Sequence, residues 1–187
     1  MATKNTKPKT QHSVTQPRHI KDNRNLLIIV DMQEGFRCKE STLIIPEIKK
    51  TIDNFPGEII FSCFVDRAGS KFEKDLQWEK FQKKTNQQIL AELRYPKAKK
   101  SKHTGYTILT ASLLNFIRRK QFKTIYLAGV YTDACIIKAA MDAFDNNLPV
   151  KVISNCCTSL HSRNNHKCAI DSLRHIIGNN NVKSHIH

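Results

Sequence analysis

The sequence predicts a three-layer α/β/α fold with a mostly parallel central sheet. Short runs that are apolar on both faces, as central parallel strands are, alternate along the chain with longer segments of helical periodicity. This alternation implies right-handed crossovers, which place helices on both faces of the sheet. With 187 residues, the chain has the length of one domain with a sizeable core.

The first half of the chain supplies two strands. Residues 26–30 are continuously apolar and end at Asp31, and the second buried strand, 58–65, ends at Asp66. Between them, Pro46 suits the first turn of a helix over 46–55. The next segments are a charged one, expected to be irregular, and one expected to be helical, over residues 67–84 and 85–94.

The second half repeats the pattern more clearly. A helix is predicted over 110–120 because its apolar residues share one face and its last turn, 118–120, is basic, as the helix dipole favours. Gly178 is a natural C-cap for the final helix. The remaining predicted elements are a strand at 125–130, a helix at 133–146, a strand at 150–153 and the final helix at 162–178.

The net charge of +15 is the unusual feature of the composition. Residues 1–24 carry six basic residues against one acid and are expected to form a disordered tail, with 25–187 as the folded domain. The tail is either solvated without a specific partner or an anchor for nucleic acid or an acidic surface. No apolar run reaches the length of a membrane span, and the N-terminus lacks the apolar core of a signal peptide. We therefore expect a cytoplasmic protein with six free thiols.

Candidate catalytic residues follow the strands at the predicted carboxyl edge of the sheet, where ligands bind in such folds. Asp31 ends the first strand, Cys135 lies in the first turn of the helix after the third, and a lysine-rich stretch, 97–102, precedes the helix at 110–120. With Thr132 or Asp133 as N-cap, the dipole would stabilise a Cys135 thiolate, and free N–H groups could hold an oxyanion. A small buried thiol without chemistry is the alternative reading.

These residues lie in segments that resemble the isochorismatase-like cysteine hydrolase family, whose fold has Rossmann-like layering. The similarity covers residues 25–182 and is carried by Asp31-Met32-Gln33 with Gly35-Phe36, by Lys102-His103-Thr104, and by Gly129-Val130-Tyr131-Thr132-Asp133-Ala134-Cys135. The resemblance implies a catalytic triad of Asp31, Lys102 and Cys135. Cys135 would attack an amide carbonyl, Asp31 would act as general base, and Lys102 would stabilise both. It also implies a cis peptide between Val130 and Tyr131, which would aim the N–H groups of Tyr131 and Cys135 at the oxyanion.

Several assignments remain open at this point. Lys102 aligns with the family lysine without a gap, whereas Lys100 needs a two-residue slip. Phe36, Trp78 and Tyr131 are the candidates for binding substrate. His161 and His166 follow the fourth strand and either orient substrate or lie on the surface. Relatives are commonly oligomeric, so a homo-oligomer is expected on the resemblance.

The metal-dependent branch of the family carries an Asp-x-His-x-x-His type of ligand set after the second strand, where this chain reads Asp66-Arg67-Ala68-Gly69-Ser70. No metal and no other cofactor is therefore expected. The leading hypothesis is a metal-independent cysteine hydrolase that cleaves a small amide, or a related C–N bond, through a thioester at Cys135. The charge around Lys102 suggests an anionic substrate. The alternatives are a catalytically weak hydrolase fold that serves as a basic binding module for nucleic acid or an acidic partner, and an isochorismatase-type hydrolase of a small acid.

Overall fold

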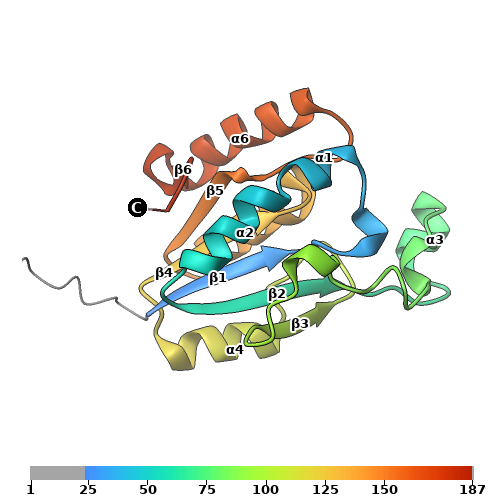
Figure 1. The fold of residues 1–187 in the computed structure, drawn as a ribbon, viewed down its shortest axis with the longest axis horizontal. Coiled ribbons are helices and arrows are strands. Elements are labelled where there is room, and N and C mark those ends of the chain that lie inside the picture. Colours follow the sequence, from blue (N-terminus) through green and yellow to red (C-terminus); the bar gives the residue numbers. More distant parts are fainter. Residues whose placement is uncertain (1–23, 187) are drawn as a thin grey trace, which may run out of the picture.

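The computed structural model describes residues 24–186, so the tail predicted over 1–24 lies outside the described residues apart from Arg24. Its centre is a six-stranded, all-parallel sheet in the order β3-β2-β1-β4-β5-β6 (Figure 1). The strands are β1 (Asn25–Val30), β2 (Glu58–Phe64), β3 (Lys99–His103), β4 (Thr124–Gly129), β5 (Val150–Cys157) and β6 (Val182–Lys183). The predicted fold class is confirmed.

Helices cover both faces of this sheet, because successive residues of a strand point to opposite sides. Leu26 and Ile28 of β1 pack in the cluster that holds the second-half helices, whereas Leu27 and Ile29 pack against α2, which lies in front of the sheet in Figure 1. The α-helices are α1 (Lys39–Leu43), α2 (Ile45–Asn54), α3 (Lys71–Leu76), α4 (Ala111–Lys120), α5 (Ile137–Asp145) and α6 (Arg163–Ile177). The shorter turns are η1 (Glu34–Phe36), η2 (Lys80–Gln82), η3 (Ala91–Leu93), η4 (Thr132–Ile136) and η5 (Asn179–Asn181).

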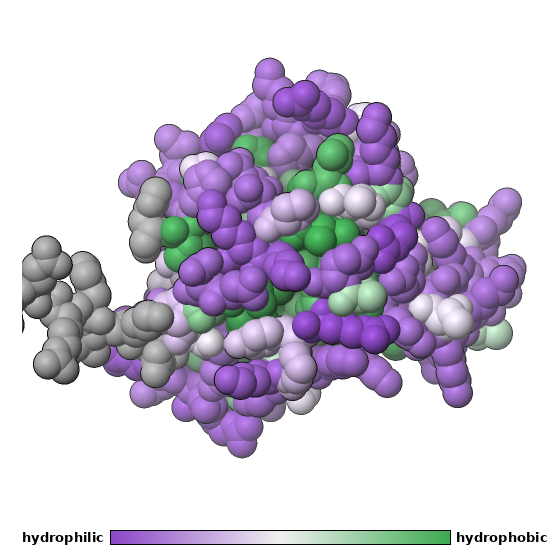
Figure 2. Space-filling model, viewed as in Figure 1, coloured by the Kyte–Doolittle hydropathy of each residue, from purple (hydrophilic) through white to green (hydrophobic). Residues whose placement is uncertain are grey.

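The outer surface is mostly hydrophilic on the face that Figure 2 shows, with hydrophobic residues in separate patches. Within residues 24–186, no helix has both the length and the apolar character that crossing a membrane requires.

The prediction of a helix over residues 85–94 is wrong. The apolar residues Ile89, Leu90 and Leu93 have a spacing that a helix would also show, and they are buried. Their backbone instead bonds to the segment after β1: the N–H of Leu90 donates to the carbonyl of Met32, and Ile89 forms an antiparallel bridge with Gln33. The backbone groups are thus satisfied by a distant segment, and only the short turn η3 forms.

Other boundaries also differ from the prediction. The charged segment 67–84 contains α3, which Ser70 caps by accepting a hydrogen bond from the N–H of Glu73. The lysine-rich segment 99–103 is the edge strand β3, which hydrophobic patterning could not reveal because its lysines are exposed. The helix predicted from residue 133 begins as the π-helical turn η4 and continues as α5. The final helix does end at Gly178 as predicted.

The strand order places β1 next to β4, and the chain runs outward from this pair in both directions. A parallel sheet has its ligand crevice at this switch point, outside the carboxyl ends of the strands. Asp31 follows β1, and η4 with Cys135 follows β4, so both residues lie at the switch point. In Figure 1 the arrowheads of β1, β2 and β3 point toward the side of the molecule that carries α3.

Gly129, the last residue of β4, is needed for the close approach of these two strand ends. Its φ is +121°, and a Cβ there would lie 2.1 Å from the Val30 carbonyl oxygen. We expect Gly129→Ala to lower the free energy of unfolding by at least about 2 kcal/mol, because both the strained φ and the backbone clash oppose the side chain. Thermal unfolding measures this, with Gly105→Ala as the control, since a Cβ at Gly105 meets nothing within 4 Å. Equal losses in the two variants would contradict the prediction.

Candidate active site

Asp31 follows the core strand β1 and is completely buried, which is unusual for a residue with an ionisable side chain. Its backbone is left-handed, with φ +53°, which turns the chain sharply out of β1. One carboxylate oxygen, Oδ1, accepts a hydrogen bond from the Ser62 hydroxyl at 2.7 Å and lies 2.8 Å from Nε2 of His103. The other, Oδ2, is buried without a hydrogen-bond partner among the described residues. It is therefore the oxygen available to accept a proton.

Cys135 is 6% exposed and lies in η4. Burial raises the pKa of its thiol, the Asp31 carboxylate raises it further, and the backbone N–H groups of Tyr131 and Cys135 lower it by a smaller amount. Burial and the carboxylate therefore favour the protonated thiol, in contrast to the expected thiolate, and a base is needed to remove its proton during attack.

The turn between β4 and η4 brings two backbone N–H groups to the sulfur of Cys135. The peptide bond between Val130 and Tyr131 is cis, at the bond that the family resemblance named. Tyr131, rather than Thr132 or Asp133, occupies the N-cap position, and its side chain makes no capping bond. The N–H groups of Tyr131 and Cys135 both interact with the thiol. An oxyanion hole likewise consists of backbone N–H donors that converge beside a nucleophile.

The structure does not bring Lys102 together with Asp31 and Cys135. Strand residues alternate between faces, and β3 pairs with β2 in the register Ser62↔Ser101, Cys63↔Lys102. Ser62 donates to Asp31, so the residues of β3 on the Asp31 side are Ser101 and His103. Lys102 and Lys100 are exposed on the other face. Both lysine candidates therefore lie on the face of β3 that is turned away from Asp31.

His103 is the basic group beside Asp31, with its side chain 1% exposed. Its Nε2 lies 2.8 Å from Oδ1 of Asp31, and its Nδ1 lies 2.7 Å from the carbonyl oxygen of Gly105. Burial works against a charged ring, but the hydrogen bond to Asp31 and the attraction of its carboxylate outweigh burial, so the pKa of His103 is raised.

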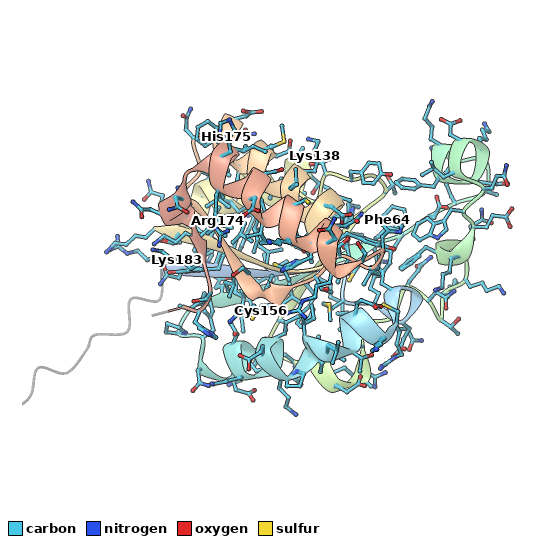
Figure 3. All side chains as sticks on the ribbon, turned by 90° about the horizontal axis from the view of Figure 1, so that it is seen from above. Phe64, Lys138, Cys156, Arg174, His175 and Lys183 are labelled. Atoms are coloured by element: carbon cyan, nitrogen blue, oxygen red, sulfur yellow. The ribbon has the colours of Figure 1, made fainter. Side chains whose placement is uncertain are left out.

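A chamber of about 310 Å³ opens above Cys135, and its wall is largely aromatic. The three predicted substrate-binding residues, Phe36, Trp78 and Tyr131, all line it. Phe36 and Trp78 stack with ring centroids 5.7 Å apart, and Tyr131 meets Phe36 edge-on at 5.4 Å. The other aromatic and ring-bearing wall residues are Phe64, Phe72, Tyr106 and His161. Figure 3 shows Phe64 at the side of the sheet that faces α3.

Charge is scarce in this chamber, despite the basic composition of the chain. Among the described residues that line it, none is Lys or Arg, and the one carboxylate is Asp133. Asp133 accepts hydrogen bonds from Ser159 at 2.6 Å and from Asn165 at 3.3 Å, so it is held in place. His161 stacks on Tyr131 at the rim, whereas His166 lies 2.8 Å from the Thr132 hydroxyl and is absent from the lining.

Sequence reasoning found Asp31, Cys135 and part of the aromatic wall but missed Ser62 and His103. Ser62 lies inside an apolar run and gave no signal. His103 had one: once 99–103 is recognised as a strand beside β2, its parity places His103 and not Lys102 on the side of Asp31. Phe72 and Tyr106 come from segments without periodicity, so only the folded chain reveals them.

The fold and the site together define an α/β protein with a buried cysteine–aspartate pair at the switch point of a parallel sheet. The chain belongs to the isochorismatase-domain family, whose model matches residues 25–180.

It is similar to "Isochorismatase domain-containing protein 2" of Xenopus laevis, with 26% identity over 74% of this chain and 62% of that relative, so it spans less than two thirds of that relative's length. Two solved structures share the fold. One is an isochorismatase-like hydrolase from Alkaliphilus metalliredigens, with a TM-score of 0.76 and 17% identity over 85% of this chain and 93% of that one. The other is N-carbamoylsarcosine amidase from Thermoplasma acidophilum, with a TM-score of 0.74 and 16% identity over 85% and 94%.

Proposed function

We propose that the protein is a cysteine hydrolase that cleaves the C–N bond of a small amide through a thioester on Cys135. One observation carries the proposal: buried Asp31, whose Oδ2 has no hydrogen-bond partner among the described residues, interacts with the buried Cys135 thiol, which lines a chamber large enough for a small molecule. An unpaired buried carboxylate oxygen is costly, so it is retained where a site uses it. The similarity to an amidase of the same fold agrees with this reaction class.

The first half of the reaction forms the thioester. Asp31 Oδ2 takes the thiol proton as the Cys135 sulfur attacks the amide carbonyl carbon. The carbonyl oxygen becomes an oxyanion, which the N–H groups of Tyr131 and Cys135 stabilise. The tetrahedral intermediate then collapses: the C–N bond breaks, the leaving nitrogen takes the proton from Asp31, and an acyl thioester remains on Cys135.

The second half returns the enzyme to its starting state. Asp31 takes a proton from a water molecule, whose oxygen attacks the thioester carbonyl. The same two N–H groups hold the second oxyanion. Collapse breaks the C–S bond, the sulfur recovers the proton from Asp31, and the carboxylic acid leaves. No step in this scheme calls on a metal, and Asp66 after β2 is followed by none of the histidines that the family's metal-binding branch uses.

The substrate we propose carries an uncharged apolar or aromatic group. The sequence alone favours an anionic substrate, because it places the basic stretch 97–102 around the site. Lys100 and Lys102 instead face away from Asp31, and the chamber wall has rings and one carboxylate. An anionic substrate would lose its hydration there without gaining a cationic partner.

Two matched substrates test this preference. We expect benzamide to be hydrolysed with a kcat/KM at least about 10-fold above that of 4-carboxybenzamide, since the second carboxylate would be buried unpaired. Ammonia release measures both rates. A preference for the carboxylate would contradict the proposed chamber chemistry without affecting the thioester step.

The proposal as a whole is tested by ammonia release from a panel of small neutral amides, with Cys135→Ala measured in parallel. Turnover that disappears in the variant supports it. Turnover that survives the substitution would exclude a cysteine nucleophile and leave the small-acid hydrolase alternative. A binding module for nucleic acid would release no ammonia from any amide in either protein, and would instead be retained on nucleic acid in a salt-dependent manner.

A further inference from the structure

The hydrogen-bond partners of His103 fix where its ring protons lie. Nδ1 is 2.7 Å from the carbonyl oxygen of Gly105. A carbonyl oxygen has no hydrogen to donate, so Nδ1 carries one and donates it. Because the ring is 1% exposed, no solvent molecule has room to take the place of this partner.

The second ring nitrogen, Nε2, faces Oδ1 of Asp31 at 2.8 Å. Ser62 does not provide the hydrogen between Nε2 and Oδ1, because its hydroxyl donates its one hydrogen directly to Oδ1 and accepts a hydrogen bond from the Asp31 N–H at 3.2 Å. An unprotonated nitrogen at 2.8 Å from a carboxylate oxygen would set two lone pairs against each other. One hydrogen therefore lies between Nε2 and Oδ1, and while Asp31 is a carboxylate that hydrogen belongs to Nε2.

We propose that His103, as an imidazolium, supplies the positive charge that the family resemblance assigned to Lys102, and so pairs with Oδ1 of Asp31 while Oδ2 is free for the Cys135 proton. The inference rests on the proposed function, because it concerns the base of that reaction. His103 acts through Asp31, so it is a positioning residue and takes no part in bond breaking.

The ionisable side chains that surround His103 come from four elements. Asp31 follows β1, Cys135 lies in η4 and Cys63 lies on β2. Burial raises the pKa of Cys63 to about 11, and burial and the Asp31 carboxylate raise that of Cys135. Lys102 is exposed on the far face of β3.

A histidine in this role has a consequence that a lysine would not have. An ordinary lysine keeps its charge up to about pH 10, whereas an ordinary histidine loses it near pH 6.5. The pKa of His103 is raised from that value, so the imidazolium is complete below about pH 6.5 and disappears as the pH rises through the raised pKa. Activity should fall over the same alkaline range.

The proton assignment is tested directly by ¹⁵N-histidine NMR on the full chain, with the His103 signals identified by their absence from His103→Gln or His103→Lys. We expect both ring nitrogens to be protonated at pH 6. On raising the pH, the ring should lose one of its two hydrogens over the same range in which kcat/KM falls. A ring with a single hydrogen at pH 6, or one that stays doubly protonated through the alkaline limb, would overturn the proposal.

The kinetic test compares pH profiles of kcat/KM. His103→Gln keeps a donor but no charge, and is expected to lower kcat/KM by about 10²-fold. His103→Lys restores a cation and should recover part of that loss and move the alkaline limb upward by at least about one pH unit. Lys102→Gln and His175→Gln should keep the wild-type limb, since His175 is exposed on α6, away from Phe64 (Figure 3).

An alkaline limb that moves in Lys102→Gln, or that stays unchanged in His103→Lys, would contradict the assignment of the charge to His103. The NMR measurement needs no turnover, so the two proposals fail separately. A doubly protonated His103 in a protein that hydrolyses no amide would exclude the proposed function, and a neutral His103 in an active amidase would exclude the inference.

Discussion

Replacing Cys135 by alanine is expected to lower kcat/KM for the best amide substrate by at least about 10³-fold. The substitution removes the sulfur that forms the thioester, and nothing else in the chamber wall offers a nucleophile next to Asp31 Oδ2 among the described residues. The fold should survive, because the side chain loses one atom in a buried position. Thermal unfolding of the variant beside its steady-state kinetics separates the two effects.

Cys156→Ala is the matched control for that experiment. Cys156 is also buried, and burial raises the pKa of its thiol. It lies on β5, with its sulfur 3.4 Å from the hydroxyl of Thr51 on α2, and it does not line the chamber. It should keep wild-type kinetics within a factor of a few. Equal loss of activity in both variants would point to damage to the core, and full activity in Cys135→Ala would exclude the thioester.

Asp31→Asn is expected to have the second-largest effect, a loss of about 10² to 10⁴-fold in kcat/KM, because an amide cannot take the thiol proton. The substitution should not disturb the backbone at this position. Asp31 has φ +53°, and asparagine is among the few residues that adopt this region readily. The amide also keeps an oxygen or an N–H for Ser62, so the loss can be assigned to the missing charge.

The same variant should show a stability change that depends on pH. The raised pKa of His103 means that its interaction with Asp31 contributes stability that is complete below about pH 6.5 and is lost as the pH rises through the raised value. Thermal unfolding of wild type and Asp31→Asn should therefore differ more at pH 6 than at pH 9. A difference that grows with pH would contradict the sign of this linkage.

The central strands could be predicted from the sequence, because burial on both faces leaves a continuous apolar run. β1 and β4 are such runs, and they fix the position of Asp31 and Cys135. β3 could not be predicted in this way. It is an edge strand with three exposed lysines, and lysine at a sheet edge protects against pairing with another chain rather than marking a buried strand.

The missed strand explains why the sequence did not place His103 beside Asp31. Without β3, the choice between Lys100 and Lys102 was made by counting along the sequence. With β3, alternation turns both lysines to solvent and His103 toward Asp31, so a shift of one residue exchanges a lysine for a histidine. The aromatic wall was only partly predictable for a different reason: Phe72 and Tyr106 belong to segments whose positions tertiary packing sets.

The net charge of +15 is not reflected in the lining of the chamber. The lysines on β3 are exposed, and none of the described residues that line the chamber is Lys or Arg. The lysines and arginines of the described residues therefore lie outside the chamber, and we propose that contacts with its aromatic rings select the substrate.

The most direct test of the account is mass spectrometry of the protein after rapid acid quenching during turnover of a neutral amide. The account predicts an added mass equal to the acyl group on the peptide that contains Cys135, absent in Cys135→Ala and longer-lived in variants that slow the attack of water. Continued turnover with an unmodified Cys135 peptide at every quench time, and with activity retained in Cys135→Ala, would contradict it.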